Sequence, residues 1–380
     1  MKFGLSIELS VPRPFVPGAE SAVFFNALEH VRVADSLGFD QVWNVEHHFL
    51  EEYSHSSAPE MFLTAAAMQT ERIHLCHGIV VCIPQFSNPI RIAERAAVLD
   101  ILSHGRAEIG TGRSSTWTEL GGFGVELDDT KKTWDEYVRM LPKMWMQERF
   151  SWESRSFSMP ERAILPKPVQ SPHPPMWVAV TSPGTELDAA DRGLGCLGVT
   201  FGGVAAYEGK VKAYRKRIQN CDPVGAFVNE QVNAVNFLYC HEDDAHGVAV
   251  GQKLAAAFSS AAAQVMDVKE YPTATYLAPG LLSNIRRDLE SPATVGGVPA
   301  GLCVGDPERI VAILKQWESA GVDRIIFLLN ALEVIPQEDV LKSLRLFAAE
   351  VMPHFPGSDG LSIDFEGEPS LVGAARGVGA

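Results

Sequence analysis

The chain has 380 residues, of which 46% are hydrophobic and 21% are charged, as is ordinary for a globular protein with a sizeable core. Asp and Glu number 47 against 32 Lys and Arg, and the resulting net charge of −15 argues against nucleic acid or an anionic membrane as a partner. No apolar run approaches the roughly 20 residues of a membrane span, and the six cysteines show no metal or disulfide spacing, so we expect a cytoplasmic protein without a membrane partner.

Short apolar segments recur along the chain and predict eight strands. In chain order they cover residues 2–9, 41–45, 73–81, 107–111, 176–180, 197–201, 232–240 and 324–329. Amphipathic helices precede four of these strands, and each helix ends at a glycine: Gly38, Gly105, Gly193 or Gly321. Alternating helices and strands imply a parallel sheet. Eight units in about 350 residues fit a closed barrel better than the alternative, an open doubly wound sheet.

We therefore predict an α/β protein built as a single (β/α)8 TIM barrel over residues 1–355, with an extended loop insertion between strands seven and eight. That loop, residues 268–305, contains four prolines and clustered glycines, together with many apolar residues. We expect it to be a mobile lid over the active site, and the alternative is a static surface excursion. Residues 150–175 form a second excursion, and the Gly-rich tail 356–380 is predicted to be disordered.

The active site of such a barrel lies at the carboxyl ends of the strands, so the polar residues there are the candidates. Strand two runs into Glu46-His47-His48. A histidine next to a carboxylate can be a base with its orienting partner, a pair of metal ligands, or a satisfied polar group at the barrel rim. No other strand end supplies an obvious His or Asp pair, so we expect no metal.

Hydroxyl residues follow strand five, where Thr181, Ser182, Gly184 and Thr185 precede a helix. The free N–H groups of a helix start suit a phosphate, and Arg113 at the end of neighbouring strand four could add a charged hydrogen bond. The alternatives are that a hydroxyl caps its own helix and that Arg113 forms a structural ion pair. There is no Walker loop, no strand-linked G-x-G-x-x-G with a following acidic residue, and no G-x-S-x-G elbow.

Several of these segments resemble the bacterial luciferase α subunit and its monooxygenase relatives. The most specific is Glu46-His47-His48-Phe49 after Gly38-Phe39-Asp40-Gln41-Val42-Trp43. Weaker matches follow in the same order along the chain, up to about Phe355: Pro89-Ile90-Arg91 to Glu94, Leu99-Asp100 to Gly105-Arg106, Ala189-Ala190-Asp191-Arg192-Gly193, Gly305-Asp306-Pro307-Glu308 and Val351-Met352-Pro353.

The resemblance implies a (β/α)8 barrel that is usually a dimer and binds FMN supplied in reduced form by a separate flavin reductase. In this family the reduced FMN and O2 give a flavin peroxide, which oxygenates a small organic substrate. We therefore expect a two-component FMN-dependent monooxygenase that acts as a homodimer. Hydroxylation and Baeyer–Villiger insertion both remain open.

The resemblance also assigns residues. His47 resembles the family's catalytic histidine, with Glu46 beside it. Arg113 and Lys131 resemble phosphate-contacting positions, and Thr181, Ser182 and Thr185, with Val180 and Gly184, resemble the phosphate loop. Val80 lies in a stretch, residues 79–81, that resembles a region that often holds a non-prolyl cis peptide under the flavin ring.

Two departures argue against light emission and long-chain aldehyde use. Gly112 stands where the luciferases have a cysteine near the flavin, and Lys131 stands where they have an arginine. The alternative functions are a deazaflavin-dependent oxidoreductase that transfers hydride on the same barrel, a catalytically inactive flavin-binding protein and, most distantly, a metal-dependent hydrolase. The presence of His47 argues against the inactive protein.

Overall fold

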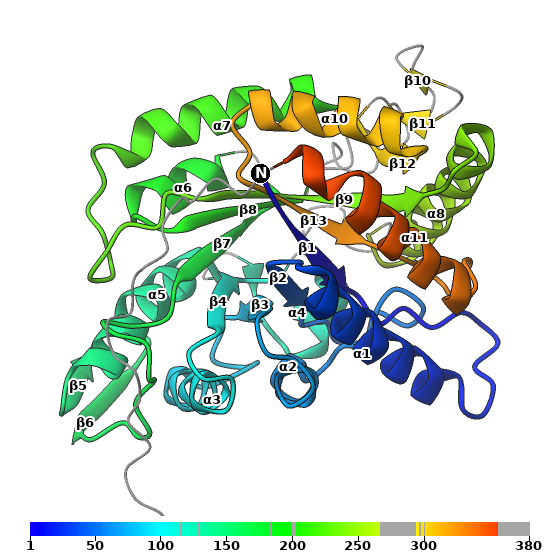
Figure 1. Cartoon of the computed structure of the whole chain (residues 1–380). Helices are drawn as coiled ribbons and strands as arrows, with labels where there is room; N and C mark the ends of the chain where they lie inside the picture. The colour runs from blue at the N-terminus through cyan, green and yellow to red at the C-terminus, as the bar shows by residue number, and fades with distance from the viewer. Residues whose placement is uncertain are drawn as a thin grey trace, which may run out of the picture.

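A computed structural model describes residues 1–114, 116–127, 130–182, 184–199, 203–266, 294–295, 298–299 and 301–355. Figure 1 shows a ring of strands surrounded by helices. The strands are β1 Lys2–Ile7, β2 Gln41–Asn44, β3 His74–Val81, β4 Ala107–Gly112, β5 Phe150–Glu153, β6 Ser158–Arg162, β7 Met176–Val180, β8 Gly195–Val199, β9 Val232–Cys240, β10 Thr294–Val295, β11 Val298–Pro299, β12 Cys303–Gly305 and β13 Arg324–Leu328. The helices are α1 Ala19–Leu37, α2 Pro59–Ala67, α3 Pro89–Leu102, α4 Trp117–Gly122, α5 Thr130–Met146, α6 Thr185–Asp191, α7 Val204–Ile218, α8 Asp244–Met266, α10 Pro307–Ser319 and α11 Gln337–Glu350.

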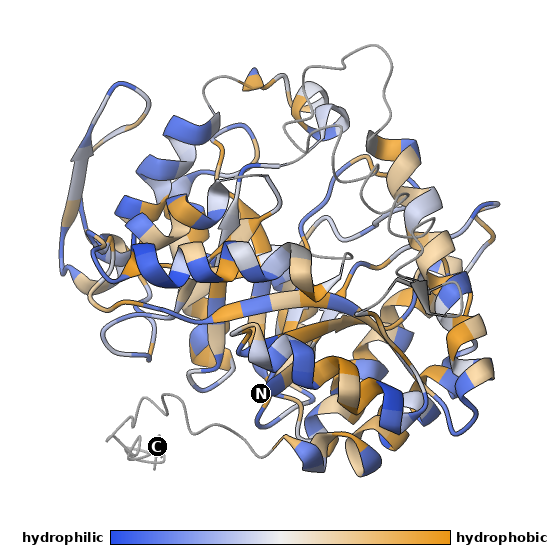
Figure 2. Cartoon of the chain, turned by 90° about the horizontal axis from the view of Figure 1, so that it is seen from above, coloured by the Kyte–Doolittle hydropathy of each residue, from blue (hydrophilic) through white to orange (hydrophobic). Residues whose placement is uncertain are grey.

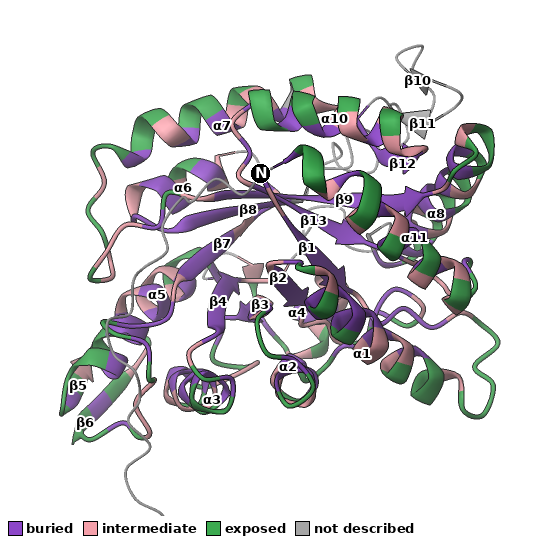
Figure 3. Ribbon diagram, in the orientation of Figure 1, coloured by how far each residue is buried: buried purple, intermediate pink, exposed green. Residues whose placement is uncertain are grey.

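Eight parallel strands form the barrel. They are hydrogen-bonded in the order β1-β2-β3-β4-β7-β8-β9-β13, and β13 pairs with β1 to close the ring, with Phe3 opposite Ile325. Figure 3 shows buried strands inside and helices whose outer faces are exposed. The predicted TIM barrel is confirmed.

The glycines predicted to end helices all adopt left-handed backbone conformations. The φ angles are +89° at Gly38, +82° at Gly105, +64° at Gly193 and +86° at Gly321. Residues with a Cβ rarely adopt this region, so the chain can leave each helix and enter the next strand at these positions.

The predicted strands match the observed ones closely, and the largest difference at a strand start is in β8. This strand begins at Gly195, two residues before the predicted range. Gly195 is opposite Trp177 in the ladder, and a Cβ there would lie 2.3 Å from the indole ring. A glycine therefore belongs to the strand because only hydrogen fits against the buried tryptophan, a contact that an apolar pattern does not reveal.

The two predicted excursions have different outcomes. Residues 150–175 contain the antiparallel β5–β6 hairpin, which projects from the helical layer in Figure 1. Of the predicted lid, residues 268–305, most lies outside the described part of the chain, and so does the tail 356–380. The described end of this loop forms β12, which extends the sheet beside β9.

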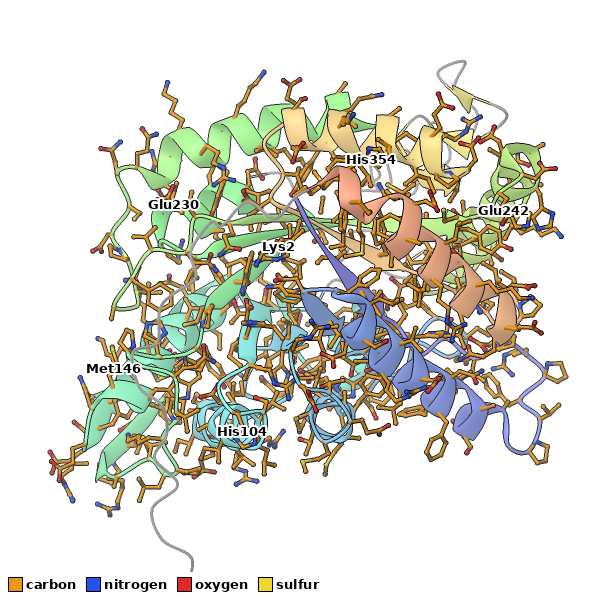
Figure 4. All side chains as sticks on the ribbon, in the orientation of Figure 1. Lys2, His104, Met146, Glu230, Glu242 and His354 are labelled. Carbon is orange, nitrogen blue, oxygen red and sulfur yellow. The ribbon has the colours of Figure 1, made fainter. Side chains whose placement is uncertain are left out.

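A buried polar cluster fills the barrel beneath the carboxyl ends of its strands. Glu108 accepts hydrogen bonds from Gln41 Nε2 at 2.9 Å and from the Trp177 indole at 2.6 Å, while Asn233 donates to Gln41 at 3.0 Å. Figure 4 shows side chains filling the space between the strands, so the open centre of the ribbon drawing is a packed core. This cluster forms a rigid floor for whatever lies above it.

Hydrophobic residues concentrate on the strands and on the inner faces of the surrounding helices, as Figure 2 shows. Among the described helices, none combines the length and the apolar character that crossing a bilayer requires.

Candidate active site

A cavity opens at the carboxyl ends of the barrel strands, where the sequence predicted the site. Its walls come from the ends of β1, β2, β3, β4 and β7, together with α5, α6 and α8. The space between the lining atoms, including the part open to solvent, is about 1400 Å³. Eight of the predicted site residues line it: Glu46, His47, Gly112, Arg113, Lys131, Thr181, Ser182 and Thr185.

His47 lies between two carboxyl groups that sequence reasoning missed. Its Nδ1 is 3.0 Å from Glu119 Oε1, and its Nε2 is 3.9 Å from Glu8 Oε2. Burial alone would lower the pKa of His47, but the Glu119 carboxylate and its hydrogen bond, aided by Glu8, raise it above the ordinary value. The two carboxyl groups therefore favour the protonated imidazole, whose Nε2 lies on the side of Glu8.

Glu119 is fully buried and held by four donors. It accepts hydrogen bonds from Ser114 Oγ at 2.7 Å, Thr116 Oγ1 at 3.0 Å and the His48 backbone N–H at 3.1 Å, besides His47. Burial raises the pKa of Glu119, but the charge on His47 and these hydrogen bonds outweigh it and lower the pKa below its usual value. This carboxylate therefore remains charged and orients the imidazole.

One sequence motif includes Glu119, although it does not reveal the contact with His47. Thr116 and Glu119 have the spacing of a capping box, and Thr116 Oγ1 does accept a hydrogen bond from the Glu119 N–H at the start of α4. The motif predicts only a helix start, however. That its glutamate reaches His47 depends on α4 packing beside the end of β2, which no local pattern shows.

Glu8 was included in the first predicted strand but not considered as a site residue. It follows β1, where a charged side chain at the end of an apolar strand is itself a signal. Burial raises the pKa of Glu8 to about 6, partly countered by His47 and reinforced by Glu119. Its Oε2 is buried without a hydrogen-bond partner among the described residues.

Glu46, the predicted partner of His47, has a different role in the structure. Its carboxylate accepts hydrogen bonds from the backbone N–H of Val81 at 2.8 Å and from His48 Nε2 at 3.3 Å. Adjacent residues in an extended chain point in opposite directions, so Glu46 faces β3 while His47 faces Glu119. The orienting carboxylate comes from α4, 72 residues away in sequence.

Another part of the cavity lining is basic and hydroxyl-rich. Arg113 follows β4, Lys131 lies in the first turn of α5, and Thr181, Ser182 and Thr185 surround the start of α6. Arg113 Nη1 donates to Thr130 Oγ1 at 3.1 Å, and Lys131 Nζ is 2.7 Å from Asp188 Oδ2. The N-cap of α6 is Gly184, with φ +85° and no side-chain cap hydrogen bond, so the capping alternative for the hydroxyls finds no support.

Three of the predicted cofactor-binding residues do not line this cavity. Val80 and Val180 are buried in the barrel, and Gly184 acts as the helix N-cap. The peptide bonds around Val80 are trans, contrary to the expectation. Every cis bond in the described part of the chain precedes a proline. Instead, the β3–β4 ladder shifts register between His77 and Val80, which bends β3 under the cavity. Ile79 of this segment also fills the space beside Gly112, where a Cβ would lie 2.7 Å from its Cδ1.

The residues present fit a phosphorylated planar cofactor. Cations and hydroxyls in the lining match a phosphate, and apolar side chains of the same lining can contact a ring system. These apolar side chains are Trp43, Val45, Ile79, Val81, Val178, Leu197 and Val235. Among the described residues, no group of three or more His, Cys, Asp and Glu side chains could hold a metal ion.

Comparison with known proteins gives a family and several relatives. The model of a family described as luciferase-like monooxygenase matches residues 1–324. The oxygenase component of a flavin-dependent trigonelline monooxygenase from Acinetobacter baylyi is 26% identical over 51% of this chain and 52% of that protein. An F420-dependent glucose-6-phosphate dehydrogenase from Amycolatopsis mediterranei is 22% identical over 86% of this chain and 93% of that protein. For the trigonelline enzyme and three further curated relatives, the alignment with this chain spans about half the length of the relative.

Solved structures show the same architecture. Monooxygenase RslO1 from Streptomyces bottropensis has a TM-score of 0.77 at 25% identity, covering 94% of this chain and all of that one. The oxygenating constituent of 3,6-diketocamphane monooxygenase from Pseudomonas putida, solved with FMN, has a TM-score of 0.75 at 16% identity, covering 93% and 98% of the two chains. At that identity the second similarity shows the fold alone.

Proposed function

Because this chain belongs to the luciferase-like monooxygenase family, we propose that it is an oxygenase component that takes reduced FMN from a separate reductase and oxygenates a small organic substrate. The observation that carries the proposal is the polarity of the cavity. One part of its lining is basic and hydroxyl-rich, and another part holds a histidine between two carboxyl groups. The relative whose name includes flavin-dependent monooxygenase supports the same assignment.

Arg113, Lys131 and the hydroxyls of Thr181, Ser182 and Thr185 would hold the FMN phosphate. A guanidinium and an ammonium give charge-assisted hydrogen bonds to phosphate oxygens, and three hydroxyls supply neutral donors. Asp188 holds the Lys131 ammonium at 2.7 Å and so keeps this flexible side chain at the cavity wall. In its reduced form, the bound flavin would supply the two electrons that the reaction of dioxygen with a substrate requires.

His47 would act as the acid–base residue. Glu119 fixes the imidazole through Nδ1, so Nε2 is the atom that faces the cavity and exchanges a proton there. Such a group contributes about 10²–10⁴-fold to a rate. Glu46 supports this geometry indirectly, because it secures His48 and the β3 backbone on either side of the cavity.

The same cavity supports a second candidate, hydride transfer by a deazaflavin such as F420. An F420-dependent dehydrogenase aligns with 86% of the chain, a longer stretch than the trigonelline enzyme does. Anaerobic titration of the full-length protein with reduced FMN and with reduced F420 would separate the two. We expect tighter binding of FMN and rapid oxidation of the bound flavin when oxygen is added. Tighter binding of F420, without an oxygen reaction, would favour the dehydrogenase.

The need for a separate reductase is consistent with the glycine pattern. Gly193, Gly195 and Gly198 have the spacing of a dinucleotide fingerprint, but they lie at the end of α6 and within β8. A nicotinamide nucleotide binds such glycines in a turn from a strand to a helix, so this segment does not fit one. Rapid oxidation of NADH or NADPH by the purified protein with flavin alone would contradict the proposal.

We also propose that the protein is a homodimer. Exposed apolar side chains on the neighbouring helices α2 and α3 support this: Met61, Met68, Val98, Ile101 and Leu102. Light scattering after size-exclusion chromatography would measure the mass, and a mass near one chain at micromolar concentration would contradict it.

A further inference from the structure

Glu8 is a buried carboxyl group with an unused acceptor. Its Oε2 has no hydrogen-bond partner among the described residues, although most buried carboxylate oxygens have one. The backbone around it is fixed, since its own carbonyl accepts from Ser54 Oγ at 2.6 Å. The Glu8 side chain lines the cavity and is 13% exposed, so a ligand in the cavity can contact the carboxyl group, although Oε2 itself is buried.

His47 does not satisfy this acceptor. The 3.9 Å between His47 Nε2 and Glu8 Oε2 exceeds hydrogen-bond length, and the imidazole already has a carboxylate partner at 3.0 Å in Glu119. Two carboxyl groups thus share one imidazole. The Glu8 end of the cavity therefore has excess negative charge and an acceptor without a donor.

Around Glu8 the cavity wall is apolar. Leu50 and Tyr53 come from the segment after β2, and Phe258 and Ala262 come from α8. The Tyr53 ring packs edge-on against His47 with centroids 5.4 Å apart and against Phe258 with centroids 5.6 Å apart. These residues come from other elements than the residues that would hold the phosphate, so they can contact a second molecule in the same cavity.

Building on the proposed function, we infer that this part of the cavity is the substrate subsite. It takes an apolar molecule with one hydrogen-bond donor, a hydroxyl or an ammonium group, and the Glu8 carboxyl group accepts that donor. The apolar body contacts Tyr53 and Phe258. A hydroxyl between the two groups can donate to Glu8 and accept from His47 Nε2, whereas an ammonium group can only donate to Glu8 and would be recognised by charge.

Three probes with one benzyl body test this inference. Benzyl alcohol has a neutral donor, benzylammonium a charged donor and benzyl methyl ether only an acceptor. Isothermal titration at pH 8, above the pKa of Glu8, would measure their binding to the full-length protein with and without FMN. The variants are Glu8→Met, which removes the acceptor, and Glu8→Gln, which keeps an acceptor but removes the charge. Glu333→Gln is the control, because this half-buried carboxyl group does not line the proposed subsite although it and Glu8 both line a small neighbouring cavity.

In the wild-type protein and in Glu333→Gln, at least one donor probe should bind about tenfold or more tightly than the ether. In Glu8→Met all three probes should bind alike. In Glu8→Gln a preference for the alcohol should persist if the substrate donor is a hydroxyl, and a preference for benzylammonium should vanish if it is an ammonium.

Equal binding of all three probes to the wild-type protein, or a donor preference that survives Glu8→Met, would overturn the inference. So would the failure of both donor probes to bind at millimolar concentration. FMN binding is measured separately, and its absence from the wild-type protein would instead contradict the proposed function. Thermal melting of each variant would show that it is folded.

Discussion

Replacing Glu119 by glutamine should lower the pKa of His47 more than any other single change in the cavity. Glutamine keeps the size of the side chain and an acceptor oxygen, but it removes the charge 3.0 Å from Nδ1. At that distance two unit charges attract by about 5.5 kcal/mol with an effective dielectric constant of about 20, and measured shifts from such neighbours are about 1–3 pKa units. In the variant, burial, the largest cause, lowers the pKa of His47 and is opposed only by the charges of Glu8 and Glu46, so we expect the pKa to fall from its wild-type value.

The measurement is a pH titration followed by NMR in protein with labelled histidine, with His47→Gln used to assign the signal. Glu46→Gln is the matched comparison, because Glu46 is adjacent in sequence but bonds His48 and Val81 instead. We expect Glu119→Gln to shift the pKa clearly more than Glu46→Gln does. If Glu46→Gln shifts the pKa more than Glu119→Gln does, the carboxylate that orients His47 is Glu46 and not Glu119.

Three further predictions concern the phosphate site, the barrel floor and a buried histidine. Arg113→Ala should weaken FMN binding about 10- to 100-fold and riboflavin binding much less, because only FMN carries the phosphate; equal losses would exclude this site. Glu108→Leu should lower the free energy of unfolding by about 3 kcal/mol, as measured by urea denaturation. This is the low end of the range for a broken buried pair, because the ion-pair partner His74 is 39% exposed. An unchanged urea midpoint would contradict the prediction. Burial lowers the pKa of His30 to about 4, so between about pH 6.5 and pH 4 only the unfolded chain gains this proton, and the free energy of unfolding should fall as the pH drops through that range. His30→Gln should flatten this pH dependence. An unaltered slope in the variant would refute the prediction.

The sequence predicts the fold well because the barrel repeats one local device. At Gly38, Gly105, Gly193 and Gly321 a helix must end in a left-handed turn, and glycine is the residue that allows it. The strands between are buried on both faces and so form apolar runs. Both signals are local, which is why they can be read without a structure.

The site is harder to predict because its key contact is not local. His47 could be selected by its place at a strand end, but its partner comes from α4 and not from the adjacent Glu46. Glu119 has the pattern of a helix cap, and Glu8 has that of a strand residue. A carboxylate acquires a second role only when packing brings it to an imidazole, and one-dimensional spacing contains no trace of that.

The proposed phosphate site and the His47 site together restrict the ligands of the cavity more than either site does alone. Arg113 and Lys131 could bind the phosphate group of many metabolites, and a histidine with carboxyl neighbours is common to many acid–base sites. A ligand that uses both must place its phosphate beside α5 and α6 and its reactive ring beside His47, with an apolar body between them. A sugar phosphate has the first group but lacks the apolar body, whereas a flavin nucleotide has both. Nε2 of His47 and the Glu8 carboxyl group are 3.9 Å apart, so the substrate donor and the reacting proton would be held side by side.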